Sequence, residues 1–185
     1  MKRLLFVSLI LVVVPAVVFA QAGQIGLFAD PGGADCNLMD TSPGPITVYV
    51  VLIDHGGAGA CDFSVRPGPG FNASFVSDTP VVGTIFGTSQ TGVSIILGAC
   101  LTEPTHVLTI NYNGFGVSST CSSLDIGDNV NVTPPSPSIT TCVGAKNLVP
   151  GKSMFVNPDA SCTCAVPVEQ TTWGHIKSLY SGNQP

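Results

Sequence analysis

The chain has 185 residues, a formal net charge of −5 and only 9 % charged residues, against the ~25 % typical of soluble domains. Six Lys and Arg residues in all cannot form the positive clusters that nucleic-acid backbones and anionic membranes attract. We therefore expect no nucleic-acid partner, and the length fits one main domain.

Residues 1–22 have the three-part layout of a secretory signal peptide. A basic start at 1–3 is followed by an apolar run at 4–14, interrupted by Ser8 alone, and by the small-residue cleavage site Ala-Gln-Ala at 20–22. The apolar run is shorter than the ~20 residues of a membrane span. We expect a secreted protein (extracellular, periplasmic or at the cell surface) with no membrane span.

Residues 23–167 are predicted to form an all-β domain. Short runs of β-branched and aromatic residues recur between clusters of Gly, Pro, Asn and Asp, as strands do. No helical pattern separates them, which favours an antiparallel β-sandwich, because parallel strands need long crossovers. The expected strands are 25–29, 46–53, 61–66, 73–77, 81–86, 93–97, 106–112, 129–133, 139–143 and 153–156.

The run 46–53 differs from the other predicted strands because both of its faces are apolar. One face carries Ile46, Val48, Val50 and Leu52, and the other carries Tyr49, Val51 and Ile53. A strand of this kind needs a cover or a partner on its outer face. Tyr49, Val51 and Ile53 are therefore candidate interaction residues.

The C-terminal tail, residues 168–185, breaks the β pattern. Trp173, Ile176 and Tyr180 fall at positions i, i+3 and i+7, which predicts a short helix. Two helical turns are not stable alone in water, so we expect these three side chains to dock on the outer face of 46–53. A sorting tag read by the export machinery is the alternative.

Seven cysteines are predicted to serve as structural staples after export. An oxidising compartment favours disulfides, and an odd number leaves at least one cysteine unpaired or intermolecular. The expected pairs are Cys36–Cys61, Cys100–Cys121, and Cys142 with either Cys162 or Cys164.

Several stretches resemble known proteins. Residues 92–100, 105–112 and 157–164, with the tail motif from Val168 to Tyr180, resemble small exported bacterial proteins of unknown function. That resemblance brings no catalytic residues. The strand order from Ile46 to Tyr112 resembles a cohesin-type or immunoglobulin-like sandwich, which implies binding or scaffolding.

Two patterns raise the possibility of a reactive site. Asp54-His55 resembles part of a hydrolase triad, but no Gly-x-Ser-x-Gly motif supplies a nucleophile. Cys162-Thr163-Cys164 with His175 suggests a metal site, yet structural zinc sites place two to four residues between paired cysteines. A surface turn and structural cysteines are the favoured readings.

The carboxylates give no clearer signal. The segments 30–35 and 125–129 have the Asp, Asn and Gly that calcium loops use, without their spacing. Glu103 and Glu169 are not paired in the sequence as glycoside hydrolysis requires. We therefore expect no cofactor, and a secreted, non-catalytic interaction or structural module with a protein or glycan partner. The alternatives are a carbohydrate-binding module using Tyr49 or Trp173, and a secreted hydrolase.

Overall fold

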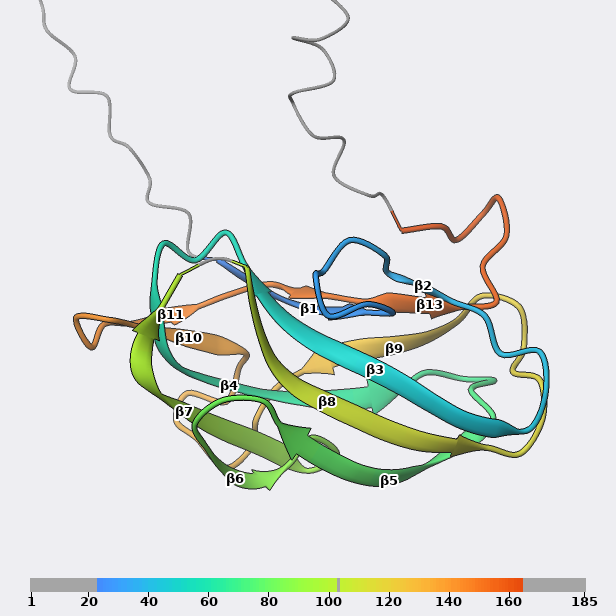
Figure 1. Ribbon diagram of the computed structural model, residues 1–185, viewed down its shortest axis with the longest axis horizontal. Helices are drawn as coiled ribbons and strands as arrows, with labels where there is room; N and C mark the ends of the chain where they lie inside the picture. The colour runs from blue at the N-terminus through green and yellow to red at the C-terminus, as the bar shows by residue number, and fades with distance from the viewer. Residues whose placement is uncertain (1–22, 103, 165–185) are drawn as a thin grey trace, which may run out of the picture.

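A computed structural model describes residues 23–102 and 104–164 of the chain, and two layers of β-strands enclose one core (Figure 1). The described part contains strands and connecting turns only, so the predicted helix of the tail lies outside it. The strands are β1 (Gln24–Phe28), β2 (Asn37–Leu38), β3 (Gly44–Ile53), β4 (Ala58–Pro67), β5 (Ala73–Pro80), β6 (Thr84–Thr88), β7 (Gly92–Leu101), β8 (Thr105–Gly114), β9 (Ser122–Gly127), β10 (Ser138–Thr141), β11 (Lys146–Leu148), β12 (Gly151–Lys152) and β13 (Met154–Val156).

The first sheet has the order β12-β1-β3-β8-β5. In the second sheet, β4 pairs with β7 on one side, and β7 with β6. The other side of β4 pairs with β10 over its first half and with β9 over its second half. Beyond them, β10 pairs with β11, and β9 pairs with β13, which pairs with β2. Only two of the described pairings are parallel, β1 with β12 and β2 with β13. The predicted all-β, antiparallel sandwich is confirmed.

The core follows the alternation seen in the sequence. From β3, Ile46, Val48, Val50 and Leu52 point inward and are almost fully buried. From β4, Cys61, Phe63 and Val65 meet them from the opposite sheet. Burial of each large aliphatic or aromatic side chain stabilises the fold by about 1.5–3 kcal/mol. These two strands, which face each other across the two sheets, form the centre of the core.

The expected orientation of Val107 is wrong. In the sequence, Leu108 and Ile110 alternate with Val107 and Thr109, which predicts an outer position for Val107, but it is fully buried. The pairing with β3 shifts at this point, since Val50 faces Leu108 whereas Val51 faces His106. This irregularity leaves Val107 without a partner in the register, and it turns inward.

The expected strand 129–133 is also wrong, because this segment is a turn. The Asn129 side chain accepts a hydrogen bond from the Asn131 N–H at 2.9 Å and donates one to the Val93 carbonyl at 3.0 Å. Asparagine side chains form such local bonds at the expense of strand pairing.

The outer face of β3 has a cover, as its two apolar faces predicted. Phe28 and Val51 form a fully buried cluster with Cys36, and Tyr49, Ile53 and Cys164 pack against it. Lys152 Nζ lies 5.0 Å from the centre of the Phe28 ring. The cover described here is therefore the Cys36–Cys164 disulfide together with Phe28 of β1, while the tail that was expected to cover this face lies outside the described residues.

The predicted disulfide pairs are wrong, although six of the seven cysteines are bonded. The bonds join Cys36 to Cys164, Cys100 to Cys142 and Cys121 to Cys162. Cys61 is left free and buried, as an odd count requires. Burial raises the pKa of its thiol, and the neighbouring Asp62 charge raises it further.

Candidate functional site

The outer face of five adjacent strands of the second sheet, β6, β7, β4, β10 and β11, is the candidate site. Directly paired residues point to the same side of a sheet, so the register defines what this face presents. Two rows cross it: Thr84, Ile96, Ala60, Thr140 and Lys146, and beside it Phe86, Ser94, Asp62, Ser138 and Leu148. We call this surface the β6–β11 face.

A polar network occupies the centre of the β6–β11 face. The Asp62 carboxylate accepts hydrogen bonds from the hydroxyls of Ser94 and Ser138, and Lys146 Nζ lies 3.1 Å from its Oδ2. Asn129 donates from its amide to Ser94 Oγ at 3.3 Å. The network joins four strands, β4, β7, β10 and β11, and a loop, and it fixes the orientation of the acid in the middle of the face.

Large apolar side chains lie on either side of this network and are open to solvent. Phe86 and Ile96 are diagonal neighbours on β6 and β7, exposed by 56 % and 53 %. Leu148 on β11, at the other end of the row, is also exposed by 56 %. Large apolar side chains exposed together on one face can mark a surface that contacts a partner.

The Asp54-His55 pair lies in the connection between β3 and β4. His55 is 5 % exposed; its Nδ1 accepts a hydrogen bond from the Gly57 N–H at 3.0 Å, and its Nε2 lies 3.5 Å from Thr105 Oγ1. Asp54 has a positive φ of 54°, as a residue in a tight turn does. His55 therefore stabilises the turn between β3 and β4.

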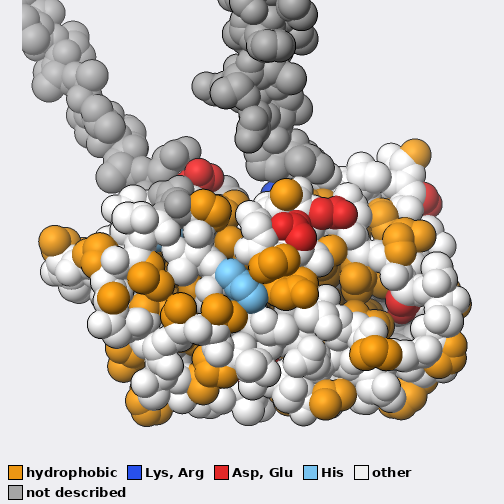
Figure 2. Space-filling model, viewed as in Figure 1, with side chains coloured by type: hydrophobic (Ala, Val, Ile, Leu, Met, Phe, Trp, Pro, Cys, Tyr) orange, Lys and Arg blue, Asp and Glu red, His pale blue; other side chains and the backbone are white. Residues whose placement is uncertain are grey.

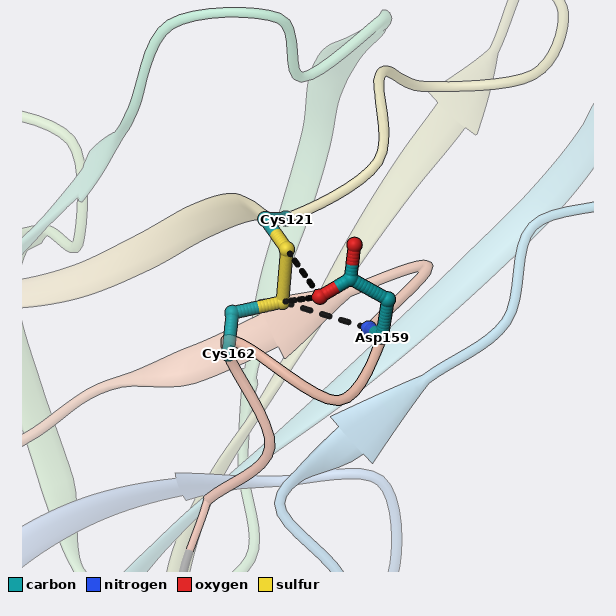
Figure 3. Close-up of side chains that lie close together, drawn as sticks. All are labelled: Cys121, Asp159 and Cys162. Carbon is teal, nitrogen blue, oxygen red and sulfur yellow. Dashed lines mark hydrogen bonds between the residues drawn. A yellow bond between two sulfur atoms is a disulfide. The ribbon is translucent and has the colours of Figure 1, made fainter.

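The cysteines of the suspected metal site are used in disulfides. Cys121, Asp159 and Cys162 bring their ligand atoms within 4.8 Å of one another (Figure 3), but the two sulfurs are bonded to each other. Cys164 is bonded to Cys36, and His175 lies outside the described residues. A cysteine binds a metal as its thiolate, which neither sulfur of a disulfide provides. The nearby Asp159 carboxylate is oriented by hydrogen bonds from Ser161, and these bonds lower the pKa of Asp159.

The acidic segments considered for calcium direct their oxygens at the protein itself. Asp30 accepts hydrogen bonds from the backbone N–H groups of Gly32, Ala34 and Asp35. Asp125 accepts from two serine hydroxyls. Of the two glutamates considered for hydrolysis, Glu103 and Glu169, neither belongs to the described residues.

A buried carboxylate borders a small hollow at the β3 end of the molecule. The hollow, lined by residues 38–47, has a volume of about 250 Å³, below the roughly 300–1,000 Å³ of small-molecule sites. Asp40 is bound there by the Ser118 N–H and hydroxyl and by the Asn157 amide. These contacts join three loops, and they engage the carboxylate from within the protein.

The sequence-derived interaction residues lie apart from the β6–β11 face. Tyr49 and Ile53 are half-buried on the outer side of the first sheet, and Val51 is fully buried beneath the Cys36–Cys164 disulfide. Trp173, Ile176 and Tyr180 lie outside the described residues. Val51 is therefore a packing residue here, whereas Tyr49 and Ile53 retain partial exposure.

Comparisons with known proteins identify the fold. No family model and no curated protein matches the chain. Among solved structures, a type II cohesin domain from the cellulosome of Acetivibrio cellulolyticus matches with a TM-score of 0.52 and 10 % identity, over 74 % of this chain and 95 % of that one.

Two other solved structures agree with this result. A cohesin module from a Clostridium perfringens family 33 glycoside hydrolase matches with a TM-score of 0.50 and 8 % identity, over 75 % of this chain and 99 % of that one. A type I cohesin–dockerin complex from Clostridium thermocellum matches with a TM-score of 0.50 and 10 % identity, covering 75 % and 100 %. The described residues contain no helix that is long and apolar enough to cross a membrane. The described domain is an all-β sandwich with the fold of cohesin modules.

Proposed function

We propose that this chain is an exported, non-catalytic module that binds a protein partner through the β6–β11 face. The observation that carries the proposal is the exposure of Phe86, Ile96 and Leu148 around the Asp62 network on one sheet face. Apolar groups supply the binding free energy, and a fixed charged pair supplies orientation and selectivity.

Two further observations support this role. The Clostridium thermocellum neighbour was solved as a cohesin–dockerin complex, so a sandwich of this fold serves protein binding in that case. Three disulfides suit an oxidising compartment outside the cytosol. The proposal thus includes both the export of the chain and the contact of its partner with the β6–β11 face.

The β6–β11 face is tested by charge substitutions with a matched control. Proteins of the secreted and envelope fractions are captured on the immobilised chain, and each candidate is purified and titrated by calorimetry. For a true partner, Phe86→Asp and Leu148→Asp each weaken binding by about tenfold or more, which corresponds to about 1.4 kcal/mol.

Phe115→Asp is the control, because Phe115 is 64 % exposed and lies just after β8, off the β6–β11 face. Its affinity should stay within about twofold of the original, as for a residue outside the interface. A partner that loses affinity equally with all three variants, or with Phe115→Asp alone, contradicts the proposed face.

A further inference from the structure

The outer face of the first sheet presents an uncharged surface on β3, β8 and β5. Thr47 donates to Asn111 Oδ1 and the Asn111 amide donates to Ser77 Oγ, both at 3.3 Å. Beside this row, the rings of Tyr49 and His106 meet edge to face, with centroids 5.2 Å apart. Figure 2 views this side: hydrophobic side chains and a His lie over its centre, and most of the visible Asp and Glu side chains lie in its upper half.

The chain leaves the described structure on this same face. Cys164, the last described residue, is bonded to Cys36 and packs against the cluster of Phe28 and Val51. Its N–H also donates to the Asn37 side chain at 3.3 Å. The disulfide therefore holds Cys164, from which the segment 165–185 continues, against the same cluster that Tyr49 and Ile53 contact.

From this arrangement we infer that residues 165–185 dock on the outer face of β3 and β8 of their own chain, anchored by the Cys36–Cys164 disulfide. The segment supplies the chain's only Trp, Trp173, with Ile176 and Tyr180. Tyr49 and His106 offer an aromatic surface that is only half-covered by the described residues.

Distance and tethering both favour docking within one chain. The nine residues from Cys164 to Trp173 span up to about 30 Å when extended, whereas the strands β3 and β8 lie only about 5 Å apart. A segment fixed at one end is present at an effective concentration of about millimolar. Weak apolar contacts are then sufficient to keep it bound. The inference is independent of the β6–β11 face, which belongs to the other sheet.

The single Trp makes the test direct, using the full chain with its disulfides intact. Docking predicts that Trp173 emits at shorter wavelength and is less quenched by acrylamide than in the guanidinium-unfolded chain. Tyr49→Ala should remove the shift and raise the quenching. Phe86→Ala, an aromatic truncation on the opposite sheet, should change neither value.

A second variant keeps the test decisive if Tyr49→Ala fails to fold. Cys36→Ala/Cys164→Ala in the full chain should raise quenching of Trp173 by removing the anchor, while circular dichroism confirms that the sandwich persists. Quenching equal to that of the unfolded chain in the original protein overturns the inference. So does protection that appears only as protein concentration rises, which would mean docking on a second copy.

Discussion

Breaking the Cys100–Cys142 disulfide should remove a large part of the stability of this domain. The bond links residues 42 apart in the sequence, and the chain-entropy relation for a loop of that length gives about 4 kcal/mol. Whole domains are stable by only about 5–15 kcal/mol. Cys100→Ala/Cys142→Ala should therefore shift the urea midpoint strongly downward, with a somewhat steeper slope, because the denatured chain without the cross-link exposes more surface.

The two single variants make this prediction specific to the pairing. Because either substitution alone breaks the same bond, Cys100→Ala, Cys142→Ala and the double variant should lose similar amounts, so their effects are strongly non-additive. Under the pairing expected from the sequence, Cys100 with Cys121, the substitution Cys142→Ala would leave Cys100 bonded. Additive losses for Cys100 and Cys142, or non-additive losses for Cys100 and Cys121, would refute the observed connectivity.

Three further predictions follow from buried polar groups. Asp62→Ala should lower the free energy of unfolding by about 2 kcal/mol, because it leaves the fully buried Ser138 hydroxyl without its partner; no loss in urea unfolding would contradict the network. Cys61 should resist iodoacetamide in the native protein and react once it is unfolded, since burial raises its pKa, and labelling of the native thiol by mass spectrometry would argue against this. Burial also raises the pKa of Tyr112 from 10.0 to about 12, so its contribution to stability is complete below pH 10 and is lost as pH rises towards 12; ultraviolet titration should show a late phase that Tyr112→Phe removes.

The sequence predicts the sandwich well wherever a strand is half-buried. In the sequence, Cys61 and Phe63 alternate with the polar Asp62, which predicts that both point inward, and the structure buries both. The sequence also showed that β3 needs a cover on its second face, which Phe28 and the Cys36–Cys164 disulfide provide. Alternation carries this information because successive side chains of a strand point to opposite faces.

The disulfide map was not predictable because pairing depends on which strand ends meet in space. The predicted disulfides joined cysteines that are close in sequence, whereas Cys36 is bonded to a cysteine 128 residues away. One signal was present in the sequence. Cys61 alternates with core residues in the middle of a predicted strand, and the structure leaves it enclosed by the core. Its inward orientation argued against a bond to a loop cysteine.

The β6–β11 face was missed for a related reason. Asp62, Ser94 and Ser138 come from three strands, and in the sequence each is an ordinary polar residue on the outer side of its own strand. Only the register between β4, β7 and β10 brings them together. The exposure of Phe86 also required the register, since the expected strand 81–86 gave no indication that β6 lies at the edge of its sheet.

The Cys121–Cys162 and Cys36–Cys164 bonds use cysteines two residues apart at the end of the described domain, just before the segment 165–185. A mechanical load applied to that segment reaches Cys164 first and passes through covalent sulfur bridges to Cys36 and Cys121. The short strand β13 is thus shielded from peeling away from β9. If the C-terminus serves as a tether, extension by pulling should begin elsewhere in the domain under oxidising conditions, and at this end once the bridges are reduced.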